Sequence, residues 1–191
     1  MYLQLLGDQG LDEMLQNLDE QFARDTRRQG CRREDCRGVL HSARFRRKPR
    51  GLAGLRAQES YRHSFCCARR NCRTRSTSPS VRFLGPKVYL AAVVVVVSVL
   101  RCGATPLRVQ RLSQLTGASR RTIQRWRSWW LHQFPLSTFW QLKRADFIEP
   151  AQMEQALPLS ALERFQADSA RERLILFLRF LAPLQTNTLN L

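Results

Sequence analysis

The stretch LRVQRLSQLTGASRRTIQRWRSWW, residues 107–130, decides how this chain is expected to fold. It predicts two helices joined by a short turn, because Gly117 can adopt a positive φ and Ser119 is a good N-terminal cap. Leu112 and Leu115 give the first helix an apolar face. At about 100° per residue, three large apolar side chains share one face of the second helix: Ile123, Trp126 and Trp130.

The opposite face of the second helix carries Arg121, Gln124, Arg125 and Ser128. Arginine can donate to two acceptors of guanine, and glutamine can bond two positions of adenine. We therefore expect these four side chains to contact DNA bases in the major groove, as the recognition helix of a helix-turn-helix protein does. The alternative is a core helix of an ordinary bundle whose basic face is solvated.

Two cysteine pairs with equal spacing lie upstream of this stretch. Cys31 and Cys36 enclose four residues, and so do Cys67 and Cys72. Two short cysteine turns can supply four thiolates to one tetrahedral ion, so the sequence predicts a structural Zn²⁺ bound by these four residues. Free cysteines scattered through a cytosolic protein are the alternative.

Other side chains leave the ligand set open. Cys66 stands beside Cys67 and makes the pairing ambiguous, and His41 or His63 could replace a thiolate. Cys102 follows an apolar run, where we expect a small buried hydrophobic side chain rather than a ligand.

Residues 25–85 are rich in Arg, Gly, Ser and Cys and contain two short strand-like pieces, VLHSARF and SYRHSF. Little helical periodicity accompanies them. The segment therefore predicts a small β zinc ribbon that gains much of its folding energy from the metal.

The positive charge of the chain is confined to one block. The formal net charge is +17, and residues 24–130 hold 26 basic and four acidic residues. Residues 1–23 hold five acids and no Lys or Arg, and residues 131–191 hold six of each sign. Such a block indicates a polyanionic partner, which we expect to be double-stranded DNA. A solvated basic surface, or a compositional bias toward arginine, is the alternative.

Phosphate contacts are expected from basic residues outside the base-reading face. Some lie in the segment RFRRKPRG between the two strand-like pieces, and others, including Arg32 and Arg33, lie in the cysteine turns. The residues assigned to the DNA backbone are Arg46, Arg47, Lys48, Arg50, Arg69, Arg70 and Arg120.

Helical patterns occur on both sides of the β module. Residues 10–24 predict an acidic amphipathic helix. The run PKVYLAAVVVVVSVL, residues 86–100, predicts a buried helix that starts at Pro86, with a strand as the alternative. Thr105 and Pro106 fit the N-terminal cap and first turn of the next helix.

The last third of the chain is also expected to be helical. Ser160 with Glu163, and Ser169 with Glu172, each match the capping box that opens a helix. The run LILFLRFLAPL is apolar nearly all round, so we expect it to pack in the core, with a dimer interface as the alternative.

The longest apolar run, residues 88–100, has 13 residues, fewer than the roughly 20 that a membrane-spanning helix needs. The N-terminus carries Asp8, Asp12 and Glu13 and no positive leader. We therefore expect no membrane contact and a cytoplasmic, nucleoid-associated location. In that reducing compartment, paired cysteines favour metal over disulfides.

The order of these parts resembles the zinc-ribbon and helix-turn-helix regions at the N-termini of bacterial insertion-sequence transposases and related mobile-element proteins. The resemblance covers about residues 29–132 and implies roles for Cys31, Cys36, Cys67 and Cys72 as the metal-binding turns. It also implies a recognition face made of Arg121, Gln124 and Arg125. The cysteine turns here are longer than the two-residue turns usual in such ribbons.

Catalysis is not expected. Transposases of this kind hold Mg²⁺ with three carboxylates on a large mixed sheet, and residues 26–130 contain only Glu34, Asp35 and Glu59 as acids. A phosphate-binding glycine loop and the common hydrolase motifs are missing as well. The sequence therefore predicts a binding protein rather than an enzyme.

These expectations combine into an α+β, mostly α fold, in which a β zinc ribbon precedes a helix-turn-helix domain. The predicted parts are an acidic helix (1–28), the ribbon (29–84), the helix-turn-helix domain (85–134) and a helical C-terminal segment (135–191). The expected function is sequence-specific DNA binding by an accessory factor, a relic or a regulator, with a homodimer as an option. The alternatives are a basic protein that coats RNA or DNA, and a membrane-surface or protein-interaction module.

Overall fold

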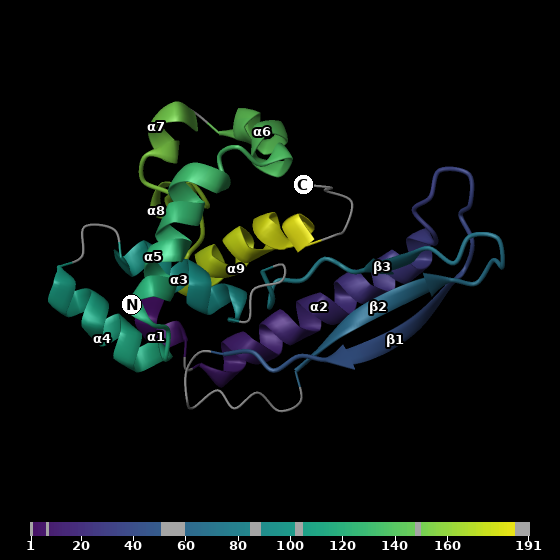
Figure 1. The fold of residues 1–191 in the computed structure, drawn as a ribbon, viewed down its shortest axis with the longest axis horizontal. Coiled ribbons are helices and arrows are strands. Elements are labelled where there is room, and N and C mark those ends of the chain that lie inside the picture. The colour runs from purple at the N-terminus through teal and green to yellow at the C-terminus, as the bar shows by residue number, and fades with distance from the viewer. Residues whose placement is uncertain are drawn as a thin grey trace.

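The chain forms a small sheet and a larger helical body (Figure 1). Helices dominate, and the described strands form a three-stranded antiparallel sheet. The predicted α+β, mostly α class is therefore confirmed. The computed structural model describes residues 2–6, 8–50, 60–84, 89–101, 105–147 and 150–185.

Helix α2 (Gln9–Gln29) connects the helical body with the sheet (Figure 1). Leu11 and Leu15 lie in the core of the helical body, whereas Ala23 packs with Phe65 and the cysteines beside the sheet. The amphipathic helix predicted near the N-terminus is confirmed. Its apolar side chains contribute to two separate clusters.

The sheet consists of β1 (Leu40–Arg46), β2 (Tyr61–Cys67) and β3 (Arg75–Thr77), in that order. Leu40 lies opposite Cys67, which fixes the register of β1 and β2 at the end where the cysteine turns begin. Both strand-like pieces of the sequence therefore form strands, and the antiparallel pairing brings their distant cysteines together.

Helix α3 (Ala91–Arg101) occupies the middle of the helical body. Its residues 91–99 are all buried, because α1, α4, α5 and α9 pack around it. The helices and helical turns of the body are α1 (Tyr2–Leu5), α4 (Pro106–Thr116), α5 (Arg120–Ser128), the π-turn η1 (Trp129–Gln133), α6 (Thr138–Lys143), η2 (Arg144–Asp146), α7 (Pro150–Glu154), α8 (Leu159–Glu163), α9 (Ala170–Leu181) and η3 (Ala182–Gln185).

The valine-rich run is helical, as predicted, but the helix starts at Ala91 rather than at Pro86. Leu90 forms a bridge with Phe83, and its N–H donates to the carbonyl of Arg50 at 3.4 Å. These contacts hold Leu90 in an extended conformation, so the helix cannot begin earlier. Pro86 itself lies outside the described residues, and so does Cys102.

Three of the predicted helix starts are confirmed by their capping bonds. The side chains of Thr105, Ser119 and Ser169 each accept a bond from an N–H three residues ahead. The predicted cap at Ser160 is wrong, because its hydroxyl donates to the carbonyl of Met153 at 2.6 Å. Helix α8 instead starts after Pro158 without a side-chain cap.

The apolar run LILFLRFLAPL forms most of α9, and five residues of this helix are buried in the main core, as predicted. The apolar face of α4 differs from expectation, since Leu112 is buried but Leu115 is 44% exposed. Thr116, one helical turn after Leu112, takes the inner position instead. Within the described ranges, no helix has the length and apolar character needed to cross a bilayer.

Candidate metal centre and basic surface

Four cysteine side chains meet at one end of the sheet. Cys31 and Cys36 belong to the turn after α2, and Cys67 and Cys72 to the end of β2 and the turn after it. Their Sγ atoms all lie within 4.8 Å of one another, with Cys31 and Cys72 3.7 Å apart and Cys36 and Cys67 3.5 Å apart. In a tetrahedral site with Zn–S bonds of about 2.3 Å, the sulfurs are about 3.8 Å apart. The four thiols could therefore hold one metal ion.

The two cysteine turns share one hydrogen-bonding pattern. The N–H of Cys36 donates to the carbonyl of Arg33 at 2.9 Å, and the N–H of Cys72 donates to the carbonyl of Arg69 at 3.0 Å. Each bond closes a tight turn that points both thiols of a pair inward. The equal spacing in the sequence thus corresponds to two copies of one local structure.

Each cysteine turn is followed by a residue with left-handed backbone. The φ angle is 41° at Arg37 and 50° at Arg73, a region that normally favours glycine. Gly38 comes next in the first turn, and a Cβ there would lie 2.8 Å from the Sγ of Cys67. The close approach of this backbone to the sulfur cluster therefore requires glycine.

The four thiols differ in their surroundings. Cys72 is the least buried, and the Thr74 hydroxyl 3.0 Å from its Sγ helps to lower the pKa of Cys72 to about 6. At Cys67 the N–H of Arg69 acts to lower the pKa, but burial and the neighbouring thiols outweigh it and raise that pKa to about 12. Of Cys67 and Cys72, Cys72 is therefore the thiol that carries negative charge at the lower pH.

The alternative ligands lie apart from this cluster. The Sγ of Cys66 points to the carbonyls of Cys67 and Arg73. The Nε2 of His63 lies 3.1 Å from a carboxylate oxygen of Glu20, and His41 is exposed on β1. In the parts of the chain that the structure describes, the cysteines of the two turns form the group with metal-binding geometry.

Helix α5 turns its polar face outward. Ile123 is 1% exposed and Trp126 5%, and the next apolar residue on this face, Trp130, is fully buried. All four predicted base-reading residues are exposed on the other side. They are Arg121, Gln124, Arg125 and Ser128.

The turn before α5 is held by contacts to the core. Gly117 has the positive φ expected of it, 65°, and its carbonyl accepts a bond from the Tyr89 hydroxyl at 3.4 Å. The Tyr89 ring packs edge-on against Trp126, with centroids 5.0 Å apart. A residue 28 positions upstream therefore positions both the turn and the helix after it.

The residues predicted to contact phosphate lie in three places. Arg46, Lys48 and Arg50 are exposed at or just beyond the end of β1, while Arg47 is half-buried over the Phe83 ring. On the second cysteine turn, Arg69 and Arg70 are exposed, and Arg120 in α5 is exposed and donates to Gln110 at 3.2 Å.

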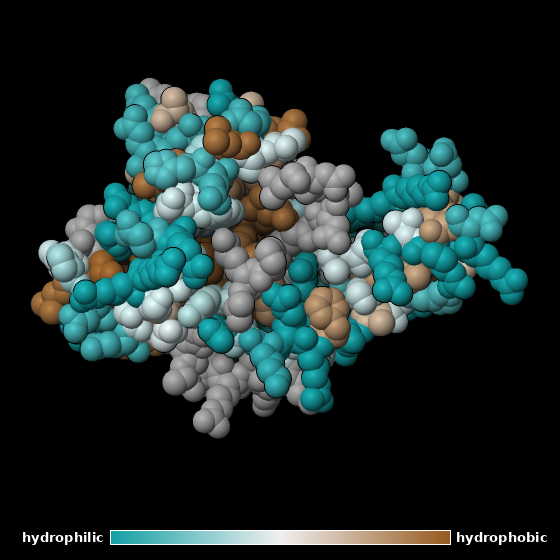
Figure 2. Space-filling view, viewed as in Figure 1, coloured by the Kyte–Doolittle hydropathy of each residue, from teal (hydrophilic) through white to brown (hydrophobic). Residues whose placement is uncertain are grey.

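Three further exposed arginines, which were not predicted, lie beside the cysteine cluster: Arg37, Arg73 and Arg75. The available signal was position, since Arg37 and Arg73 each directly follow the second cysteine of a pair. The first turn also contains Glu34 and Asp35, so the second turn is the more basic of the two. Figure 2 shows that hydrophilic residues predominate on this projecting end of the molecule.

Comparison of the chain with protein-family models, with curated proteins and with solved structures gives no match.

Proposed function

We propose that this chain is a sequence-specific DNA-binding protein related to insertion-sequence transposases, acting as an accessory factor, a relic or a regulator. The observation that carries the proposal is the orientation of α5. Its apolar face is anchored in the core through Ile123 and Trp126, and Arg121, Gln124 and Arg125 project from the opposite face. A rigid helix with guanidinium and amide groups on its free face has the chemistry for major-groove recognition.

The metal in this proposal is a structural Zn²⁺. Four sulfur ligands and tetrahedral spacing suit zinc, and a closed set of four leaves no open position for catalysis. Among the described residues, the small cluster around the cysteines includes Leu40 and Phe65 as its large apolar side chains. The ion therefore supplies stability that apolar burial on this side of the molecule does not.

The basic cysteine turns lie at the projecting end of the sheet, well separated from α5 in the helical body (Figure 1). A duplex bound by both is contacted at two separated places, with bases read at α5 and phosphates held by Arg69, Arg70 and Arg73. Phosphate contacts of this kind add affinity without sequence preference.

The deciding experiment is selection of bound sequences from random duplex DNA, followed by titrations of the selected and a scrambled site at several salt concentrations. Replacement Arg125→Ala should reduce discrimination between the two sites by about 1–3 kcal/mol. The matched control Arg70→Ala removes the same charge and should weaken binding to both sites equally, with a salt slope smaller by about one ion.

Two results would contradict the proposal. In the first, the selection yields no enriched sequence and the chain binds RNA and DNA alike, which identifies a coating protein. In the second, Arg125→Ala and Arg70→Ala have the same effect on both sites, so that α5 contributes charge and no recognition.

A further inference from the structure

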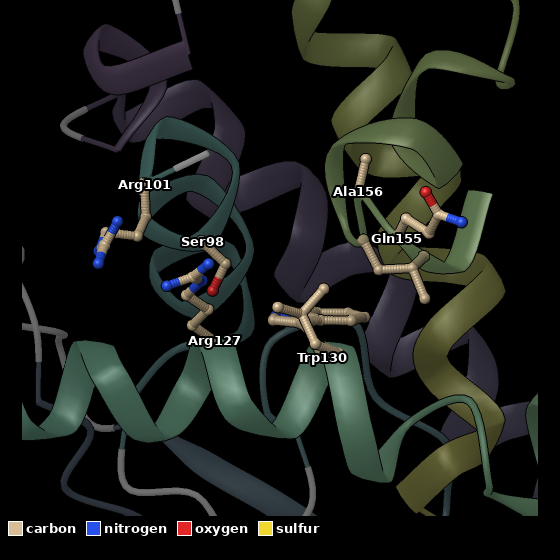
Figure 3. A pocket seen from close by; sticks show the side chains of 8 residues that line it. Ser98, Arg101, Arg127, Trp130, Gln155 and Ala156 are labelled. Atoms are coloured by element: carbon tan, nitrogen blue, oxygen red, sulfur yellow. The ribbon is translucent and has the colours of Figure 1, made fainter. Parts of the chain in front are cut away.

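A cavity of about 270 Å³ opens between α3, the junction of α5 and η1, and the α7–α8 connection. In Figure 3, Ser98, Arg101 and Arg127 lie on one side of the Trp130 ring, and Gln155 and Ala156 lie on the other. Leu131 and Leu157 complete the lining. The guanidinium of Arg127 lies on the Trp130 side of the cavity, whereas that of Arg101 is directed away from the ring (Figure 3). The cavity therefore combines one guanidinium group with walls that are partly polar and partly apolar.

The indole of Trp130 supplies an unused hydrogen-bond donor here. Trp130 is fully buried, and its Nε1 has no acceptor within hydrogen-bonding distance among the described residues. A buried N–H without a partner costs about 1–3 kcal/mol, so such a group in a folded protein calls for an explanation. Trp130 also belongs to the π-turn η1, and single π-turns inside helices occur frequently at functional sites.

The positive charge of the cavity is not neutralised by the described part of the protein. Neither Arg101 nor Arg127 forms an ion pair with a described acid. The nearest acid along the chain from Gln155 is Glu154, whose carboxylate accepts a bond from Trp140 Nε1 at 2.6 Å and lies 3.9 Å from Arg144. An acceptor with negative charge in the cavity would pair with Arg127 and satisfy the indole.

We propose that this cavity binds the oxyanion group, a carboxylate or a phosphate, of a small ligand. Arg127 donates to its oxygens, as a guanidinium group does in planar anion recognition, and Trp130 Nε1 supplies a further donor. The apolar walls take the remainder of the ligand, and the volume limits it to a small molecule. This inference is independent of the proposed function, because Arg127 is not among the base-reading residues of α5.

The test follows the indole N–H signals of the full-length, ¹⁵N-labelled protein by NMR. The chain has four tryptophans, and the Trp130 signal is assigned through its contacts with Phe134 and Phe177. The probes are inorganic phosphate, acetate and benzoate, with sodium chloride at equal ionic strength as reference. A short duplex DNA is a further probe, in which the oxyanion is a backbone phosphate.

We expect a saturable shift of the Trp130 signal with phosphate or a carboxylate and no such shift with chloride. Replacement Arg127→Gln should weaken the interaction about tenfold. The control Arg179→Gln removes an exposed arginine of α9 that does not line the cavity, and should leave the interaction unchanged.

Three outcomes would overturn the proposal. The free anions shift the signal no more than chloride does, or the shift survives Arg127→Gln. In the third outcome, duplex DNA alone produces a saturable shift, and the cavity then holds a backbone phosphate rather than a small ligand.

Discussion

Asp19 shows at the scale of one residue how α2 is attached to the chain after the sheet. Its carboxylate accepts bonds from the Ser80 hydroxyl and from the N–H of Val81, both at 2.7 Å. Burial raises the pKa of Asp19 to about 6, although these two bonds and the charge of Arg82 act in the opposite direction. A buried carboxylate with two short bonds therefore joins segments 61 positions apart.

The raised pKa of Asp19 predicts a definite pH dependence. The folded protein holds the proton of the Asp19 carboxyl group more tightly than the unfolded chain does, in which the pKa of Asp19 is 3.8. The stability gained from this tighter proton binding is therefore complete below pH 3.8 and is lost as the pH rises through 6. Over this pH range the free energy of unfolding decreases by about 3 kcal/mol. Replacement Asp19→Asn should remove this pH dependence. The difference in unfolding free energy between the original protein and the variant should therefore vary between pH 4 and pH 7. Urea unfolding at several pH values measures this, and a constant difference would show that Asp19 does not titrate there.

Arg73 is predicted to serve a partner rather than the fold. Its φ of 50° suits glycine better than arginine, so Arg73→Gly should leave metal binding intact and change stability by no more than about 1 kcal/mol. The same change should weaken DNA binding at selected and scrambled sites alike. Metal analysis and binding titrations test both parts. Loss of metal in the variant would instead assign Arg73 a structural role.

At the scale of elements, the cysteine turns form a site only when two strands pair. We expect purified protein to contain one zinc ion per chain. Replacement Cys36→Ser or Cys72→Ser should empty the site and speed amide hydrogen exchange over residues 29–80. The matched control Cys66→Ser should leave the site filled, because the Sγ of Cys66 points away from the cluster. If Cys66→Ser loses the zinc and Cys67→Ser keeps it, the ligand is Cys66 rather than Cys67.

At the scale of the whole molecule, α2 connects two apolar clusters of very different size. The larger surrounds α3, and the smaller contains the cysteines with Ala23, Leu40 and Phe65. Removal of the metal by a chelator should therefore unfold the sheet and the end of α2 while the helical body stays folded. Hydrogen exchange resolved by segment tests this. Equal loss of protection in α3 and α9 would mean that the molecule is one cooperative unit.

The sequence by itself determined the features that depend on neighbouring residues. Caps at Thr105, Ser119 and Ser169 and the left-handed Gly117 follow from the chemistry of single residues and their nearest partners. The equal spacing of the two cysteine pairs likewise marked the four thiols that meet.

Only the tertiary structure decided what depends on contacts beyond a single helical turn or cap. Pairing of Leu90 with Phe83 moved the start of α3, and packing of Ser160 against Met153 removed a cap that its local sequence favoured. The bond between Asp19 and Ser80 and the cavity around Trp130 have no sequence signature at all. The residues of these two features lie far apart along the chain. A spacing pattern in the sequence indicates only which side chains share a face of a helix or strand, whereas packing decides which other segment that face contacts.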